Sequence, residues 1–397
     1  MRVTPELVNV ETGYRLWSDS YDRPLKDIFD IQKEIAGKVA EALQVTLGVG
    51  SAAAPGMTRN VPAYEEWLRA LSFLNAYRPD SFQPAVDHAQ RAISLDPSFA
   101  NAWLALSFIY ANGSGMVPER AAEWSRRAPE ALERARALAP DSVGPQWISA
   151  IFLVGNGRWL EAGALVDKLR KKGTPPGETW FNPTMAEGRI LLAAGRAKDA
   201  IEVYERARAA EPLDTGVALY LGESYAIAGR TADARAEFNR GLKIGSLQPL
   251  LLGSSLLLAL SERDRGEIDK RVALFDENKL LDERSRAMAK LLDTPAAAPA
   301  EIRRLATLPR NQVFIGYSVL ASWAAYYNQP ELALDYLNKI VRSSPDPSLL
   351  WRPQMRDVRK LPGFKDLLRN TGYVEYWRTY GWSDLCHPTT GDDFECQ

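Results

Sequence analysis

An excess charge of either sign and long apolar runs are both missing from this sequence. Its 397 residues include 49 basic and 50 acidic side chains, a net charge of −1, which gives no electrostatic footprint for nucleic acid or an anionic membrane. The longest apolar run, Leu250 to Leu260, is too short to span a bilayer. The opening residues, MRVTPELVNV, lack the basic and apolar regions of a secretory signal. We therefore expect a cytoplasmic chain with no nucleic-acid or membrane partner.

Cysteine and histidine are scarce, with two of each, which limits metal and nucleophile chemistry. Cys386 and Cys396 lie in the last dozen residues and make no disulfide scaffold, although a local bridge between them stays open. His387 adjoins Cys386, but a site needs more ligands than these residues supply. His88, on a polar position of a helix, is expected to be a solvated surface residue. We expect no metal and no cofactor.

Sequence motifs for catalysis are also missing. There is no Walker loop, HExxH, paired CxxC or GxSxG. Acidic residues lie mostly beside Arg and Lys at helical spacing, as in ERAAEWSRRAPEALERAR, which is typical of a solvated helix face. We expect a protein that is not an enzyme. The alternative is an enzyme or small-molecule-binding protein with a carboxylate site between units, which a buried acidic cluster facing a closed pocket would favour.

What the sequence does contain is a repeat with a period of 34 residues. Small residues, an aromatic and a turn residue recur in the same order: Gly188, Ala200, Tyr204, Ala207 and Pro212 are followed by Gly222, Ala234, Phe238, Gly241 and Ser246. Self-similarity at this period marks stacked two-helix units. The small residues would let the two helices cross closely, and the aromatic would fill the space between consecutive units.

This pattern resembles the tetratricopeptide repeat, which implies an all-α right-handed superhelix. Composition agrees with a globular chain, 46% hydrophobic and 25% charged. The two best units set the phase of an array over residues 63–347. We expect units at 63–99, 100–142, 143–180, 181–214, 215–248 and 314–347, with a degenerate stretch at 249–313.

Residues 1–48 do not follow the repeat. MRVTPELVNV and YRLWSDSYDR are typical of two strands joined by a turn, and an amphipathic helix from Pro24 to Leu47 follows them. Pro5 cannot donate to a sheet ladder, so we expect it at an edge or bulge. This β-hairpin plus helix is too small to fold unaided. The small residues of GVGSAAAPGMTRN indicate a linker at 49–62.

The same N-terminal residues resemble the closing segment of the TolB amino-terminal-like domain, through the turn ETG, the run LWSDSYDR and then LKDIFDIQKEIA. In bacteria that domain often sits between an adenylate/guanylate cyclase or winged-helix DNA-binding module and a tetratricopeptide array. The domain's earlier strands are missing and Met1 falls in mid-strand, which indicates a shortened or split gene, or a start codon placed too late. The unpaired strand edges are a candidate site for dimerisation.

The tail, residues 348–397, resembles the end of the array in those cyclase-linked proteins. It carries a PGF turn, a short helix, a YW pair and a cysteine within WRPQMRDVRKLPGFKDLLRNTGYVEYWRTYGWSDLCHP. The resemblance implies a helical cap. Such a cap would cover the last unit, whose face is otherwise open to water.

Arrays of this kind bind peptides on their concave face, through the first helix of each unit. On the phase above, that face carries Trp67, Leu71, Leu104, Phe108, Trp147, Ile151, Met185, Arg189, Leu219 and Glu223. Arg189 alone matches the clamp of the chaperone-tail-binding members, so that clamp is not carried over. An apolar to aromatic face favours an apolar peptide or helix. If the true unit boundaries are shifted by one residue from those assigned above, some of these side chains belong to the core.

These observations predict a non-catalytic protein-interaction scaffold. The resemblances make it the sensory or interaction part of a bacterial signalling or transcription-regulator system. A truncated gene product with no independent role is a third interpretation.

Overall fold

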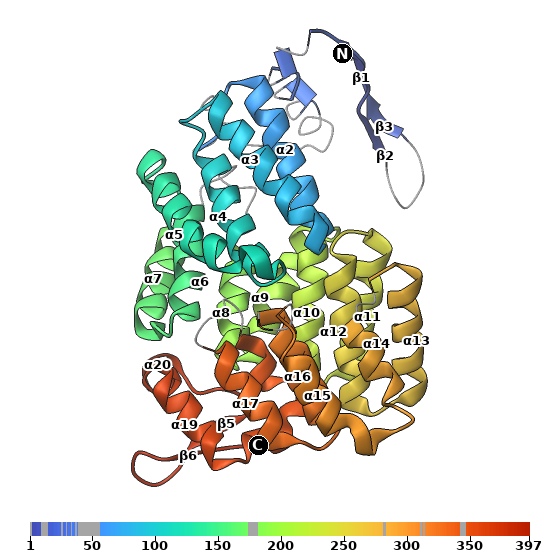
Figure 1. Cartoon of the computed structure of the whole chain (residues 1–397). Helices are drawn as coiled ribbons and strands as arrows, with labels where there is room; N and C mark the ends of the chain where they lie inside the picture. Colours follow the sequence, from blue (N-terminus) through green and yellow to red (C-terminus); the bar gives the residue numbers. More distant parts are fainter. Residues whose placement is uncertain are drawn as a thin grey trace.

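Helices make up most of this chain, as a computed structural model shows (Figure 1). The structure describes residues 2–8, 15–24, 56–173, 182–280, 283–309, 312, 314–341 and 347–397, with some positions between 27 and 38. The predicted all-α class is confirmed, and the small N-terminal β-hairpin is present. Within the described residues, no helix combines the length and the apolar character needed to cross a membrane.

Consecutive helices pack in pairs, and each pair stacks on the next (Figure 1). The pairs are α2 (Val61–Ala76) with α3 (Phe82–Leu95), α4 (Ala100–Ser114) with α5 (Ala121–Leu138), α6 (Gly144–Gly155) with α7 (Trp159–Lys172), α8 (Pro183–Ala193) with α9 (Ala197–Ala210), α10 (Thr215–Ile227) with α11 (Thr231–Ile244), α12 (Gln248–Glu262) with α13 (Arg265–Glu277), and α16 (Phe314–Tyr326) with α17 (Pro330–Ile340). Two shorter helices, α14 (Glu283–Lys290) and α15 (Ala298–Ala306), precede the last pair.

The recurring glycine and aromatic residue contact each other within one unit. A Cβ atom on Gly188 would lie 2.2 Å from the ring of Tyr204, and one on Gly222 would lie 2.5 Å from the ring of Phe238. Real Cβ atoms do not approach so closely, so only glycine fits there. The aromatic was expected between consecutive units. It packs instead on the glycine of its own unit, although Tyr204 also stacks on Tyr220 of the next unit, with ring centroids 6.0 Å apart.

Polar side chains fix where several of these helices begin. The side chains of Asn60, Asn182, Asp214 and Asp264 accept hydrogen bonds from main-chain N–H groups in the first turns of α2, α8, α10 and α13. These N–H groups have no partner inside the helix, so the cap stabilises each start by about 1 kcal/mol. The start of each of these four helices is thus encoded by the residue just before it.

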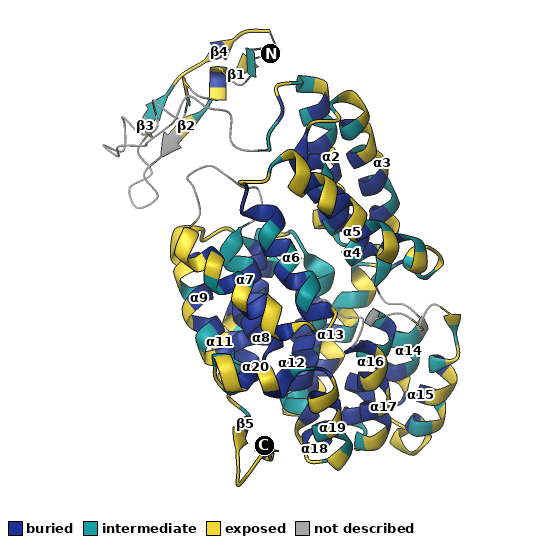
Figure 2. Cartoon of the chain, turned by 90° about the vertical axis from the view of Figure 1, so that its left-hand side faces the viewer, coloured by how far each residue is buried: buried dark blue, intermediate teal, exposed yellow. Residues whose placement is uncertain are grey.

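The N-terminal hairpin lies outside the helical array in both views (Figures 1 and 2). Strand β1 (Arg2–Val3) pairs with β4 (Tyr21–Asp22), and β2 (Glu6–Val8) pairs with β3 (Arg15–Ser18). Pro5 lies in the break between β1 and β2, in agreement with its expected position at an irregularity. The predicted helix 24–47 lies largely outside the described residues, but the described positions between 28 and 38 are helical.

The C-terminal segment, residues 347–397, folds back over the array. It comprises the 3-10 helices η6 (Pro347–Trp351) and η7 (Pro353–Met355), helices α18 (Arg356–Arg359), α19 (Pro362–Asn370) and α20 (Tyr373–Tyr380), and strands β5 (Cys386–Pro388) and β6 (Phe394–Cys396). It packs on the last helix pair, and it also reaches α7 and α8 (Figure 1). One buried apolar cluster therefore runs from α4 to β6, with two smaller clusters beneath α2–α5 (Figure 2).

Candidate docking sites

Most of the ten side chains predicted for the concave face are buried. Leu71, Phe108 and Met185 keep part of their surface exposed. The other seven are at most 7% exposed: Trp67, Leu104, Trp147, Ile151, Arg189, Leu219 and Glu223. Contact of these residues with a foreign peptide stays a prediction. One of them, Glu223 on α10, bonds to Arg352 of the C-terminal segment.

Glu223 holds part of the C-terminal segment. Its carboxylate accepts a hydrogen bond from Arg352 Nη2 at 2.5 Å and another from Ser254 Oγ at 2.6 Å. All three side chains are buried. A buried carboxylate is tolerated when it is paired and hydrogen-bonded in this way. Arg352 is held in turn, because its main-chain oxygen accepts from Arg359, whose pKa is lowered to about 10 by burial and by the nearby charge of Arg356.

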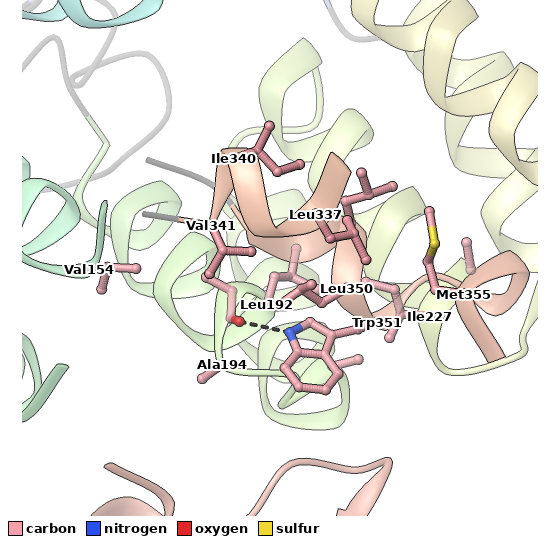
Figure 3. Packing of buried hydrophobic residues seen from close by; sticks show 14 of the residues in the cluster. Val154, Leu192, Ala194, Ile227, Leu337, Ile340, Val341, Leu350, Trp351 and Met355 are labelled. Carbon is pink, nitrogen blue, oxygen red and sulfur yellow. Dashed lines mark hydrogen bonds between the residues drawn. The ribbon is translucent and has the colours of Figure 1, made fainter. Parts of the chain in front are cut away.

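Two tryptophans attach the segment to the turn between α8 and α9. The indole N–H of Trp351 donates to the main-chain oxygen of Ala193 at 2.7 Å, and that of Trp377 donates to Ala194 at 2.9 Å. Figure 3 shows the Trp351 ring beside Leu192, Ala194 and Leu350. Both indoles are almost completely buried. Each thus satisfies its one donor while removing a large apolar surface from water.

The turn between α8 and α9 is shaped to receive this segment. Gly195 has φ +77°, a conformation that favours glycine, and a Cβ atom there would lie 2.8 Å from Trp351. Its main-chain oxygen accepts from the N–H of Asp384, and the Asp384 carboxylate accepts from the N–H of Lys198, both at 2.9 Å. The N-terminus of α9 favours that negative charge.

Aromatic rings extend the contact to α7. Trp159 lies 4.4 Å from Tyr373 and 5.3 Å from Tyr376, measured between ring centroids. Gly163 gives room to Tyr380, whose ring would lie 2.3 Å from a Cβ atom at that position. The C-terminal segment therefore joins the last helix pair to the middle of the array. The expected cap covers more than the last unit.

A cleft of about 740 Å³ remains between α2 and the turn that joins α11 to α12. The two walls meet where the N–H of Leu247 donates to the main-chain oxygen of Asn75 at 3.2 Å. Its described lining residues are mostly leucines and amide or hydroxyl side chains, and among them are one cation and no carboxylate: Leu68, Leu71, Ser72, Asn75, Ala76, Arg78, Gly245, Ser246, Leu247, Gln248, Pro249, Asn278 and Leu280. Leu71 is the predicted face residue that lines this cleft.

A cluster of charged side chains joins α2 to α3. It includes His88, which was expected to be a solvated surface residue. The Glu66 carboxylate accepts from Arg91 Nε at 2.8 Å and lies 2.7 Å from His88 Nδ1. The hydrogen bonds from Arg91 and then His88 lower the pKa of Glu66 to about 2. His88 is only 18% exposed and stacks on Phe73, so it is no solvated surface residue. The cluster is a structural brace with no adjacent nucleophile among its described neighbours.

The two cysteines are joined by a disulfide. Cys386 and Cys396 lie opposite each other in the β5–β6 pair, and His387 beside them is exposed. Because both sulfurs are used in this bond, the Cys386–His387 pair offers no thiol nucleophile in this state. Over the part of the chain that the structure describes, no three His, Cys, Asp or Glu side chains gather as a metal site would require.

Sequence reasoning missed the residues that close the array and those that form the cleft. Trp351, Trp377 and Arg352 were assigned to a cap on the last unit, and their partners lie 129 to 183 positions away. The cleft joins Asn75 to Leu247, which share no unit. Gly195 was a signal in the sequence that another segment packs closely on the α8–α9 turn. A glycine does not show which segment that is.

Comparison with known proteins agrees with the helical-repeat class. A family model described as tetratricopeptide repeat matches residues 185–249, which contain the two regular units. Over 145 residues, the chain is 27% identical to "Putative adenylate cyclase 3" of Rhizobium meliloti (strain 1021). That match covers 36% of this chain and 24% of the relative, so the chain spans about a quarter of the relative's length.

Three solved structures have a partial likeness to this chain. PilW, a widely conserved type IV pilus biogenesis factor, is 21% identical, with a TM-score of 0.39 over 57% of this chain and 97% of its own. The pilF protein of Pseudomonas aeruginosa is 16% identical, with a TM-score of 0.36 over 57% and 96%. The TPR domain of P58(IPK) is 14% identical, with a TM-score of 0.24 over 81% and 94%. The tetratricopeptide-repeat match therefore covers one part of this chain, within an array of paired helices.

Proposed function

We propose that this chain is a non-catalytic protein-interaction scaffold, and that its docking site is the cleft between α2 and the α11–α12 turn. The observation that carries the proposal is the composition of that cleft, with leucines on both walls and side-chain amides between them. The end of α8 and Glu223 of α10 bond to the C-terminal segment, which supports a docking site on another surface. The two walls of the cleft come from units far apart in the sequence, which the repeat architecture brings together.

The proposed occupant is an extended apolar segment of a partner protein. Asn75, Gln248 and Asn278 offer both donors and acceptors, which suit the main chain of an extended peptide. Leu68 is 45% exposed on the wall, so it can bury apolar surface against such a segment. Arg78 is the one charged side chain among the described lining residues, so a basic peptide would be disfavoured.

The wider setting that we propose is a bacterial signalling or regulator system in the cytoplasm. Support comes from the relative named a putative adenylate cyclase, which matches this chain over part of its length. The resemblance of residues 1–48 to a TolB amino-terminal-like segment points the same way. The hairpin strands would pair with a second copy or with an upstream partner, because their described residues, except Tyr21, are exposed or half-buried. Hydrogen exchange across 2–8 and 15–22 that slows with protein concentration would support this pairing.

Selection from a displayed library of random 12-residue peptides tests the docking site. We expect selected peptides to be rich in aliphatic residues and to bind Leu68→Asp at least ten times more weakly than the unmodified chain. Leu160→Asp is a matched control, because Leu160 is equally exposed at 45% and does not line the cleft. Peptides that bind both variants equally well would contradict the proposed site, as would a selection that yields no binder.

A further inference from the structure

The hairpin β5–β6 carries a disulfide between two regions of the C-terminal segment that have different contacts. Cys386 follows directly on residues that bind the turn between α8 and α9, and Cys396 follows on residues that bind α19. The two sulfurs close a loop across ten sequence positions. The disulfide therefore links the part of the segment that contacts the α8–α9 turn to the part that contacts α19.

The first of these regions, residues 383–385, lies on the α8–α9 turn. Asp384 bonds to both Gly195 and Lys198, and the Ser383 hydroxyl accepts from the N–H groups of Leu385 and Cys386. Ser383 itself lies against Gly195. These contacts hold the strand that leads into Cys386 in one position on the array.

The second region, residues 392–397, lies on the last helices of the segment. Phe394 is fully buried, and its ring centroid is 6.0 Å from that of Trp377. Asp393 accepts from Lys365 at 3.0 Å and from Arg369 at 2.6 Å. The N–H of Gln397 donates to Leu385, which connects the two regions without the disulfide as well.

We propose that the Cys386–Cys396 disulfide is a redox-controlled clasp that keeps the end of the C-terminal segment closed on the α8–α9 turn. In the oxidised chain, the loop 386–396 holds residues 383–385 at the turn through the anchor at Phe394. Reduction lengthens this connection and restores its conformational entropy, so residues 383–385 leave the turn more often. This inference rests on the cytoplasmic setting proposed above, in which disulfides are usually transient or redox-sensing. The clasp concerns a surface separate from the cleft proposed for docking.

A dithiol is the class of reductant that this step requires. Cys396 is partly exposed, whereas Cys386 is 2% exposed, so one thiolate of the dithiol attacks Sγ of Cys396 and releases Cys386 as a thiolate. The second thiolate of the dithiol then attacks its own sulfur in the mixed disulfide and releases Cys396. The dithiol is oxidised to a disulfide, and its two protons end on the two cysteines.

Hydrogen exchange of the full chain, with and without dithiothreitol, tests the clasp. We expect the amides of Lys198 and Asp384 to exchange at least ten times faster after reduction. Arg230 and Ala232 are internal references, because they occupy in the next unit the positions of Arg196 and Lys198. Their exchange should not respond to reduction. The double variant Cys386→Ser/Cys396→Ser should exchange at the reduced rate under both conditions.

Two results would overturn the clasp. One is unchanged exchange at Lys198 and Asp384 in a chain whose two thiols have been shown by titration to be free after reduction. The other is a purified, unreduced chain that already titrates with two free thiols. The first test uses the unmodified protein, so it remains decisive if the double variant fails to fold.

Discussion

The helix pairs α8–α11 and the C-terminal segment 347–397 are both well buried, but the contacts that bury them span very different distances along the sequence. In the pairs, each glycine meets an aromatic residue of its own unit, as Gly222 meets Phe238. In the segment, the indoles of Trp351 and Trp377 bond to residues 158 and 183 positions away. In each pair, these residues therefore pack on residues of the same unit. The C-terminal segment instead packs on helices that are distant in the sequence.

This difference changes how the whole array should unfold. A plain solenoid is stabilised by each unit and by its nearest neighbours, so it can open locally from either end. Here the end of the chain is fixed to the middle, through Glu223 and the α8–α9 turn. Opening of the last units must break these contacts first. We expect residues 183–397 to unfold as one cooperative body.

Loss of Trp351 should have the largest effect. Trp351→Ala removes a fully buried ring and its bond to Ala193, at a cost of about 3–5 kcal/mol in the free energy of unfolding. Urea denaturation followed by circular dichroism measures this. A decrease in the free energy of unfolding of less than about 1 kcal/mol would mean that the C-terminal segment contributes little to the stability of the helices it covers.

The buried pair of Glu223 and Arg352 should come next. Glu223→Leu leaves the buried guanidinium of Arg352 without its carboxylate, which costs about 3 kcal/mol or more. The double variant Glu223→Leu/Arg352→Met should lose less than Glu223→Leu alone, because neither charge is then left unpaired. Equal losses in urea denaturation would show that the two residues do not act as a pair.

Within the regular units, a smaller effect is expected at Gly222. Gly222→Ala places a methyl group against the ring of Phe238 and should destabilise the chain by about 1–3 kcal/mol. Gly253→Ala is the matched control, since a Cβ atom there would meet no described atom within 4 Å beyond the nearby backbone of α12 itself. It should be neutral or stabilising by up to about 1 kcal/mol, from helix propensity. Similar melting temperatures for both variants would remove the steric explanation of the 34-residue pattern.

The smallest effect should come from Glu66, and it depends on pH. Hydrogen bonds from Arg91 and His88 lower its pKa from 4.5 to about 2, so the ionised carboxylate adds stability above pH 4.5. That contribution is lost as the pH falls toward 2. Glu66→Gln should therefore cost about 1–2 kcal/mol at pH 7 and little near pH 2. A stability difference that stays constant over this range would exclude ionisation of Glu66 as the cause.

Local signals explain how much of this fold the sequence could predict. The Gly–aromatic spacing at Gly188 and Tyr204 and the caps at Asn182 and Asp214 act within a few turns, so they predict the repeat and the start of each helix. The repeat spacing could place Glu223 on the first helix of its unit. The bond between Glu223 and Arg352 of the C-terminal segment could not be predicted, because a single contact between distant residues produces no periodic pattern in one sequence.

The position of the C-terminal segment on the α8–α9 turn can be measured directly by zero-length carbodiimide cross-linking. Lys198 Nζ lies 3.9 Å from the Asp384 carboxylate, and Lys365 Nζ lies 3.0 Å from that of Asp393 as a reference within the segment. Mass spectrometry of the monomer should find both links. A Lys365–Asp393 link without any Lys198–Asp384 link would show that the segment folds by itself and does not close the array.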